Sequence, residues 1–516
     1  MSKLAAVRNL VLILGDQLDE ASAAFDGFDP AQDRVVMIEA VEESTHVWSH
    51  KARIALFLSA MRHFSLVIES RGWPVDYRKL DVENDDSLAS GLEVLIDTYQ
   101  VKGVILVEPG DMRVRNSLID LVTKKGCTTE IRADRHFICS IDQFKRWAGT
   151  SKTLRMEFFY RDMRKRSGVL MEDEKPIGGQ WNYDAENRKS FGKSGPQDVP
   201  MPPMFAPDAI TRDVIAMVES RFSDHPGATA HFNWPVTRDD ALIALRNFIE
   251  HRLAEFGPHQ DAMWTTLHFG WHSLLSTSLN LKLLNPREVI AAAEAAFKAR
   301  RVDLASAEGF IRQILGWREF MRGVYFLDMP AMKAANHFGH KNALPKWYWN
   351  GQTQMNCLKH CVNQTLDYGY AHHIQRLMIT GMFGVTAQIE PQQLCDWYLS
   401  VYVDAIEWVE LPNTAGMALF ANGGRFTSKP YVASGAYVKR MSNYCDGCRY
   451  RPDQKTGANA CPLTTLYWNF LDTHEASFAS NPRTALMVKN LQRMTDEERA
   501  VIRGEAKRLL SDLDAL

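Results

Sequence analysis

Residues 445–462, CDGCRYRPDQKTGANACP, place three cysteines in one short stretch, and Cys357 precedes them in the chain. A CxxC pair such as Cys445 and Cys448 puts two thiolates within reach of one metal centre, and cysteines brought in by the fold can complete a four-thiolate site. A cysteine followed by proline, as at Cys461-Pro462, recurs among iron–sulfur ligands. Zinc and an iron–sulfur cluster fit this spacing equally well, and buried inert thiols are the alternative without a metal.

The composition of the chain is that of a globular protein with several domains. Of its 516 residues, 46% are apolar and 24% charged, and the net charge of −2 does not by itself indicate a nucleic-acid partner. Eight cysteines are too few for a disulfide scaffold. We expect no signal peptide and no membrane segment. A reducing, cytoplasmic compartment follows, where CxxC indicates metal or redox chemistry.

Residues 1–140 alternate between strand-like and helix-like segments. The expected strands are 10–14, 35–40, 75–80, 103–109 and 129–134, and a helix is expected over 47–71. This alternation predicts an α/β domain with a mostly parallel, Rossmann-like sheet. Ligands of such sheets bind beyond the carboxyl ends of the strands.

The ends of the first two strands therefore predict a ligand crevice. Its candidate residues are Gly15, Asp16, Gln17, Glu39 and Glu43. The chain contains no GxGxxG motif in this region, which argues against a dinucleotide.

The remainder of the chain divides into a linker and a helical domain. Residues 141–225 include a basic, aromatic segment at 151–168 and a stretch at 178–207 rich in Gly, Pro and Asn, which indicates an interdomain linker. The basic residues could meet phosphates or form a solvated helix face. Residues 226–516 show amphipathic helices almost without period-two alternation, which predicts an all-α domain.

Three stretches of the helical part carry a resemblance to a known family. The segment WREF (317–320) resembles the signature of the photolyase/cryptochrome superfamily, and YAHHIQRL (370–377) looks like the flavin-site helix of that superfamily. Together with the cysteines, KPYVASGAY (429–437) resembles its bacterial iron–sulfur branch, the prokaryotic (6-4) photolyases. The resemblance covers the full length.

The resemblance implies light-dependent repair of (6-4) pyrimidine–pyrimidone photoproducts in DNA. The expected cofactors are FAD in the all-α domain, a [4Fe–4S] cluster, a 6,7-dimethyl-8-ribityllumazine antenna in the N-terminal crevice and Mg²⁺, with Asp261 as a candidate ligand. The expected substrate is UV-damaged DNA, single- or double-stranded. The protein would be a bacterial, cytoplasmic monomer.

The same resemblance assigns roles to individual residues. The FAD site would contain Ser273, Ser276, Arg318, Arg376, Asp404 and Glu410. The cluster ligands would be Cys357, Cys445, Cys448 and Cys461, with Cys361 the competing choice one helical turn from Cys357. Electrons would reach the flavin through Trp349, Trp397 and Tyr398. The lesion pocket would be lined by Tyr431, Tyr437 and Gln313.

His373 is the expected proton donor, with His372 beside it, because histidine titrates near neutrality. The alternative for a lone histidine or aromatic is a place in the core, but two adjacent histidines on the flavin helix favour catalysis.

Two other functions of the protein stay open. One is a cryptochrome-like blue-light sensor with the same cofactors. The other is a primase-like iron–sulfur protein that binds nucleic acid without flavin.

Overall fold

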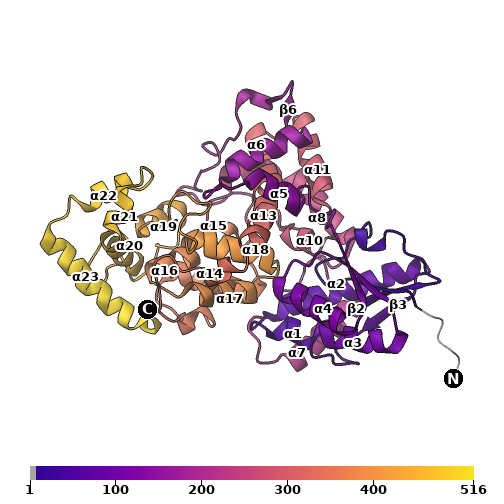
Figure 1. The fold of residues 1–516 in the computed structure, drawn as a ribbon. Coiled ribbons are helices and arrows are strands. Elements are labelled where there is room, and N and C mark those ends of the chain that lie inside the picture. The colour runs from indigo at the N-terminus through magenta and orange to yellow at the C-terminus, as the bar shows by residue number, and fades with distance from the viewer. Residues whose placement is uncertain (1–6) are drawn as a thin grey trace.

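A computed structural model describes residues 7–516, and its N-terminal part is a five-stranded parallel sheet (Figure 1). The strands are β1 (Asn9–Leu12), β2 (Asp33–Ile38), β3 (Val75–Arg78), β4 (Gly103–Val107) and β5 (Thr128–Arg132), in the order β3-β2-β1-β4-β5. The surrounding helices are α1 (Val41–Thr45), α2 (Lys51–Ser70), α3 (Leu88–Tyr99) and α4 (Met112–Lys124). The expected α/β domain is therefore confirmed.

The two faces of the sheet are covered by different helices because side chains alternate along each strand. Leu10 and Leu12 belong to a small core with Leu92 and Leu118 of α3 and α4. Val11 points the other way and joins the main hydrophobic core together with α2. With both faces buried, the strands read as nearly continuous apolar runs, as parallel strands usually do.

Residues 141–225, expected as a linker, contain three helices and a short hairpin. They are α5 (Ile141–Ala148), α6 (Met156–Ser167), β6 (Met171–Glu172), β7 (Lys175–Pro176) and α7 (Ala209–Arg221). Helix α7 packs on α2, and α6 packs on the π-helical turn Arg312–Arg318. The longest stretch of this segment without a helix or strand is residues 180–208. Much of this segment is therefore packed structure, because its helices bury apolar faces such as Phe159 and Val214.

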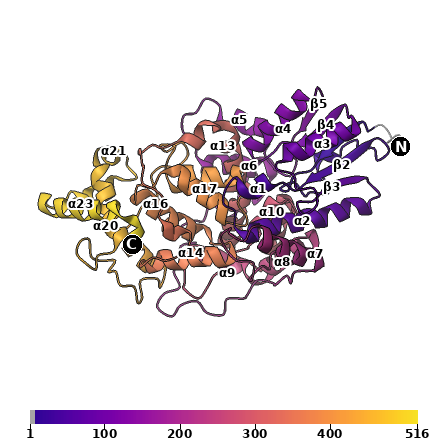
Figure 2. The same ribbon diagram turned by 90° about the horizontal axis from the view of Figure 1, so that it is seen from below.

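The expected all-α domain is confirmed for the remainder of the chain. Its helices are α8 (Arg238–His251), α9 (Leu253–His259), α10 (Ser276–Asn280), α11 (Pro286–Lys298), α12 (Leu304–Ile311), α13 (Glu319–Asp328), α14 (Asn356–Tyr368), α15 (His373–Gln375), α16 (Met382–Thr386), α17 (Pro391–Val401), α18 (Glu407–Leu411), α19 (Gly435–Met441), α20 (Pro462–Thr473), α21 (Glu475–Ala479), α22 (Ala485–Leu491) and α23 (Asp496–Ser511). Helices α20–α23 lie at the end of the molecule opposite the sheet (Figures 1 and 2). No helix within residues 7–516 is long and apolar enough to cross a membrane.

Three π-helical turns interrupt the helical domain. They are Arg312–Arg318, Arg376–Gly381 and Pro412–Ala418. Turns of this kind are rare and occur frequently at functional sites. The second of them begins at one of the expected flavin-site residues, Arg376.

Candidate functional site

One largely buried arginine lies against two carboxylates in the helical domain. The Arg376 guanidinium donates to Asp404 at 3.0 and 3.2 Å, and its Nη1 lies 3.9 Å from Glu410. The same guanidinium lies 3.7 Å from the centre of the Tyr402 ring. Ser276 donates to Asp404 at 2.7 Å and ties α10 to these residues. We call Arg376, Asp404, Glu410 and Ser276 the Arg376 cluster.

The charges of the Arg376 cluster are unbalanced, since one cation serves two carboxylates. Burial raises the pKa of Glu410 to about 7, and Arg376 only partly offsets this effect. Thr414 donates to the Glu410 carboxylate at 3.0 Å. Burial lowers the pKa of Arg376, but Asp404, Tyr402 and Glu410 raise it more, so it stays cationic. The cluster thus offers one fixed cation and one carboxyl that titrates near neutrality.

Several buried polar atoms near the Arg376 cluster have no protein partner. They include the hydroxyls of Thr277 and Ser278 on α10 and one ring nitrogen each of His272 and His372. Buried polar atoms are rarely left unsatisfied in proteins, so these atoms point to a polar ligand. Hydroxyls and amides at this loop suit phosphate oxygens. The residues therefore fit a ligand that carries phosphates and a polar ring system, such as FAD.

Three histidines lie together beside the Arg376 cluster, and only one of them is exposed. His272 and His372 are both buried and stack, with ring centres 4.5 Å apart and planes at 15°. Burial lowers the pKa of His272 to about 3 and that of His372 well below its ordinary value, so both are neutral. The side chain of His373 is 53% exposed, and its Nε2 lies 3.6 Å from the Asp261 carboxylate.

His373 is consequently the histidine that a large ligand can reach. Desolvation lowers its pKa, and the carboxylate of Asp261 acts in the opposite direction. Burial first, and then the charge of Asp261, raises the pKa of Tyr437 to about 12. Burial and the charge of Asp184 raise the pKa of Tyr431. The charge of Asp261 thus acts on both His373 and Tyr437.

Two expected site residues are engaged elsewhere. Arg318 donates to Glu319 at 3.3 Å and to His136 at 3.1 Å, and it lies over the ring of Phe137 at 4.2 Å. These contacts put its guanidinium at the interface with the N-terminal domain rather than in the Arg376 cluster, because a buried cation needs partners and the interface supplies them. Gln313 uses its amide within its own helix, where it donates to the Gly309 carbonyl at 2.9 Å.

Two of the expected electron-transfer residues, Trp397 and Tyr398, are in contact. The rings of Trp397 and Tyr398 lie 5.3 Å apart, and both side chains are buried. The Tyr398 hydroxyl donates to the Arg376 carbonyl at 2.5 Å. On the outer side, the Trp397 indole donates to the carbonyl of Tyr348 at 3.0 Å, and Tyr348 precedes Trp349 in the chain.

Four cysteines line one cavity. Cys445 and Cys448 form the CxxC pair, and Cys357 and Cys461 come from other parts of the chain. Burial raises the pKa of Cys357 well above its usual value, and the next largest effect is that of Cys461. Cys361 does not line this cavity; its thiol faces the Tyr444 hydroxyl at 3.9 Å.

The cavity of these cysteines differs from a single-ion site. Within residues 7–516, no group of three or more His, Cys, Asp or Glu side chains is arranged to hold one metal ion. A set of four thiols around a cavity fits an iron–sulfur cluster by the chemistry of its donors. Gly435 also leaves room here: a Cβ on it would lie 3.1 Å from the Cys461 sulfur.

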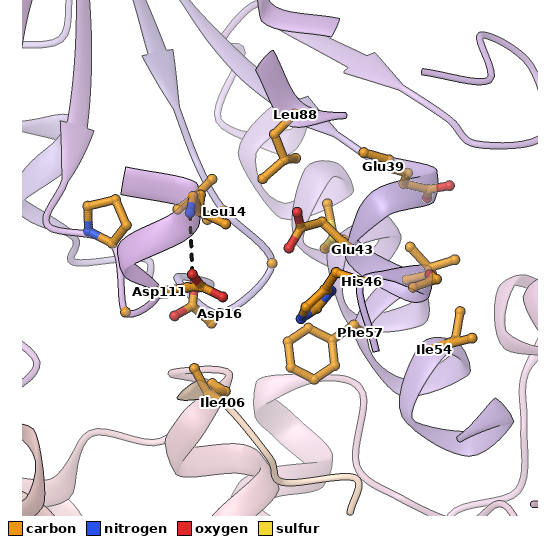
Figure 3. A pocket seen from close by; sticks show the side chains of 18 of the residues that line it. Leu14, Asp16, Glu39, Glu43, His46, Ile54, Phe57, Leu88, Asp111 and Ile406 are labelled. Carbon is orange, nitrogen blue, oxygen red and sulfur yellow. Dashed lines mark hydrogen bonds between the residues drawn. The ribbon is translucent and has the colours of Figure 1, made fainter. Parts of the chain in front are cut away.

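The pocket at the carboxyl ends of the strands lies between the two domains (Figure 3). The empty space within it is about 850 Å³, which includes open solvent at its mouth. Gly15, Asp16, Glu39 and Glu43 line it, as the strand positions predict. A Cβ on Gly15 would lie 3.0 Å from the Met61 sulfur, so glycine is needed for this close approach.

The polar groups of this pocket are already partly paired. The Glu39 carboxylate accepts two bonds from Arg62 at 2.8 and 2.9 Å, and Figure 3 shows it pointing away from Asp16. Glu43 is bound by Arg113 at 3.0 Å. The expectation for Gln17 needs correction: its amide donates to Val107 at 3.2 Å and does not line the pocket, because it joins the ends of β1 and β4.

Sequence reasoning missed the residues that complete the pocket from outside the strand ends. They are Arg53, Leu399, Ile406 and Glu407, of which the last three come from the helical domain. Nothing in the local sequence around α17 and α18 indicates contact with the sheet, since the approach depends on domain packing. His272 was also missed, although it directly precedes Ser273, which was expected in the flavin site.

Comparisons with known proteins agree with this architecture. A family profile described as "Deoxyribodipyrimidine photo-lyase-related protein" matches residues 11–234. Two solved structures share the fold: a bacterial class III photolyase from Agrobacterium tumefaciens (TM-score 0.55, 16% identity, 85% of this chain and 87% of that one) and a cryptochrome from Synechocystis sp. PCC6803 (TM-score 0.54, 14% identity, 85% and 89%). The fold is that of the photolyase/cryptochrome class.

A similar protein of known name identifies the family within this class. The chain is 45% identical over 506 residues to the "(6-4) photolyase" of Agrobacterium fabrum, covering 98% of this chain and 99% of the relative. A shorter viral protein, "Uncharacterized protein R855" of Acanthamoeba polyphaga mimivirus, is 32% identical over 120 residues, which is 23% of this chain and 90% of that protein. The chain belongs to the photolyase family.

Proposed function

We propose that this protein repairs (6-4) photoproducts in DNA in a light-dependent reaction. The observation that carries the proposal is its 45% identity, over nearly its whole length, with a protein named (6-4) photolyase. That relation also argues against the primase-like alternative, which has no flavin. We further propose that the protein acts as a monomer in the bacterial cytoplasm and accepts single- or double-stranded damaged DNA.

FAD is the cofactor that the Arg376 cluster would hold. Bound and reduced FAD, once excited by light, supplies an electron to the lesion. Arg376 and Asp404 would orient the polar edge of the flavin ring, and Ser273, Thr277 and Ser278 would bind its phosphates. Glu410, with a pKa of about 7, would hold or release a proton beside the ring.

His373 would give the lesion a proton from its Nε2, the atom that lies 3.6 Å from Asp261. Desolvation lowers the pKa of His373, and the Asp261 carboxylate partly offsets this by favouring the imidazolium that would give up the proton. A damaged base must leave the stack to reach such a group, and aromatic side chains commonly line the receiving pocket. Tyr431 and Tyr437 would provide this lining. Asp261 is also the candidate ligand for Mg²⁺.

Two further cofactors are part of the proposal. The cavity lined by Cys357, Cys445, Cys448 and Cys461 would hold a [4Fe–4S] cluster, supported by its four thiols. The pocket of Figure 3 would hold 6,7-dimethyl-8-ribityllumazine as an antenna. Glu43 and Asp16 would meet its polar groups, and Phe57 would contact the ring system.

A blue-light sensor with the same cofactors is the competing function, since a cryptochrome shares the fold. The exposed His373 beside Asp261 favours repair, because a sensor needs no proton donor on the substrate side. The test is illumination of the reduced protein with oligonucleotides that carry either a (6-4) photoproduct or a cyclobutane dimer, in single and double strands. Light-dependent restoration of the (6-4) substrate supports the proposal. If neither lesion is repaired, while flavin photochemistry persists, the sensor is the better description.

A further inference from the structure

Two tryptophans meet where the N-terminal domain contacts the helical domain. Trp48 lies in the connection between α1 and α2 and is 42% exposed, which is unusual for so large an apolar side chain. Its ring centre lies 4.9 Å from that of Trp349, with the planes at 51°. Trp349 is only partly buried and belongs to the helical domain. The pair therefore joins the two domains at the surface of the molecule.

The backbone around Trp48 is fixed to the helical domain by buried hydrogen bonds. The His50 amide donates to Ser400 at 2.8 Å, and the His50 ring contacts the Leu366 carbonyl at 2.8 Å. The contacts with Ser400 and Leu366 hold the segment that carries Trp48 against α17 and α14. His225, outside the helical domain, also bonds to the Ser49 carbonyl at 2.8 Å. The exposed indole thus keeps its place against Trp349 without being buried itself.

Aromatic residues lead inward from this pair, and the first of them, Tyr348, directly precedes Trp349 in the chain. The Tyr348 carbonyl accepts a bond from the Trp397 indole at 3.0 Å, and the two rings lie 4.9 Å apart. The ring of Tyr402 lies 5.9 Å from that of Trp397 and 5.4 Å from that of Tyr398. The Arg376 guanidinium lies over the face of the Tyr402 ring. The series therefore runs from solvent at Trp48 to the Arg376 cluster.

We propose that Trp48 is the outermost electron donor of this series, contributed by the N-terminal domain. The proposal rests on the proposed function, in which light draws an electron inward through Trp397 and Trp349. One electron then passes from the Trp48 indole to oxidised Trp349, which returns to its neutral state. Oxidised Trp48 loses its indole N–H proton to water, and an external thiol returns one electron and one proton to it.

The difference in solvent exposure between Trp48 and Trp349 gives the direction of this electron transfer. A positive charge on a buried side chain lacks hydration, and burying a charge without a partner is costly. Trp349 is partly buried and Trp48 is open to water, so the charge is better solvated on Trp48. Moving it there also increases its distance from the flavin site and slows the return of the electron. Contact with solvent gives the external thiol direct access.

The test compares Trp48→Phe, Trp48→Tyr and Trp73→Phe in the flavin-containing protein. Phenylalanine keeps an aromatic ring against Trp349 but is far harder to oxidise, whereas tyrosine can still be oxidised. Trp73 is the matched control: it is a partly buried tryptophan of the same domain, packed against Phe25 and Phe28. The readouts are the rate of flavin photoreduction with an external thiol and the lifetime of the tryptophan radical after a laser flash.

We expect Trp48→Phe to shorten the radical lifetime and to slow photoreduction several-fold, Trp48→Tyr to restore part of the rate, and Trp73→Phe to behave as wild type. Equal lifetimes and rates in Trp48→Phe and wild type would overturn the proposal. So would an equal loss in Trp73→Phe, since it would show a general effect of domain packing. Repair by chemically reduced wild-type protein tests the proposed function separately, because that reaction bypasses the aromatic series. If it repairs lesions while Trp48→Phe photoreduces normally, only the proposal for Trp48 fails.

Discussion

Replacing Glu410 by glutamine should change the pH dependence of stability in a way that the structure quantifies. Glu410 is 6% exposed, and burial raises its pKa from 4.5 to about 7 because Arg376 is shared with Asp404. At about 1.4 kcal/mol per pH unit, the ionised carboxylate costs the folded state about 3 kcal/mol. Glutamine has nearly the same shape and cannot ionise, so Glu410→Gln removes this cost.

The sign of this pH dependence follows from the number of protons that the folded and unfolded states bind. Between the unfolded pKa of 4.5 and the folded pKa of about 7, the folded protein holds a proton that the unfolded chain has released. Stability of the wild type therefore falls as pH rises through this window, and the loss is complete above the folded pKa. Glu410→Gln should match the wild type near the acid end of the window and exceed its free energy of unfolding by about 3 kcal/mol above it.

The assay is denaturant unfolding of both proteins at the two ends of this window, followed by fluorescence and by flavin release. Glu186→Gln, at an exposed position, is the control and should have the stability of the wild type at both pH values. A difference between Glu410→Gln and wild type that is the same at both pH values would refute the reasoning, since it would mean that Glu410 does not ionise within the window.

Four further predictions test the other sites. Cys448→Ala should lose iron and sulfide and become insoluble, because the metal ties the C-terminal segment to the helical domain, while Cys361→Ala keeps its iron; zinc without sulfide in the wild type would contradict the cluster. His373→Ala should retain FAD and photoreduction but lose roughly 10²–10⁴-fold in repair per absorbed photon, and near-wild-type repair would remove its assigned role. Trp397→Phe should slow photoreduction, measured by flavin absorbance, without loss of FAD; an unchanged rate indicates another route. Phe57→Trp should abolish lumazine absorbance by filling the pocket, and full occupancy would place the antenna elsewhere.

Local patterns in the sequence determined the elements of this protein. The apolar run GVILV became the fully buried strand β4, and the expected strand at 35–40 became β2, because a strand between two helical layers needs apolar residues on both faces. Helix α11 begins after Asn285 because Asn285 and Glu288 form a capping box, with Pro286 in the first turn. Such signals lie within one element, so a single sequence contains them.

Only the tertiary structure decided which distant residues meet. Cys357 and Cys361 lie one turn apart on α14 and look equivalent in sequence, yet Cys357 faces the cavity of the CxxC pair and Cys361 faces Tyr444. Arg318 meets His136 across the domain interface, and Trp48 meets Trp349. These contacts join residues far apart in the chain, and they depend on how whole helices and domains pack. Local sequence patterns contain no information about that packing. The motifs therefore indicated the chemistry of each site, and only the fold determined which residues belong to it.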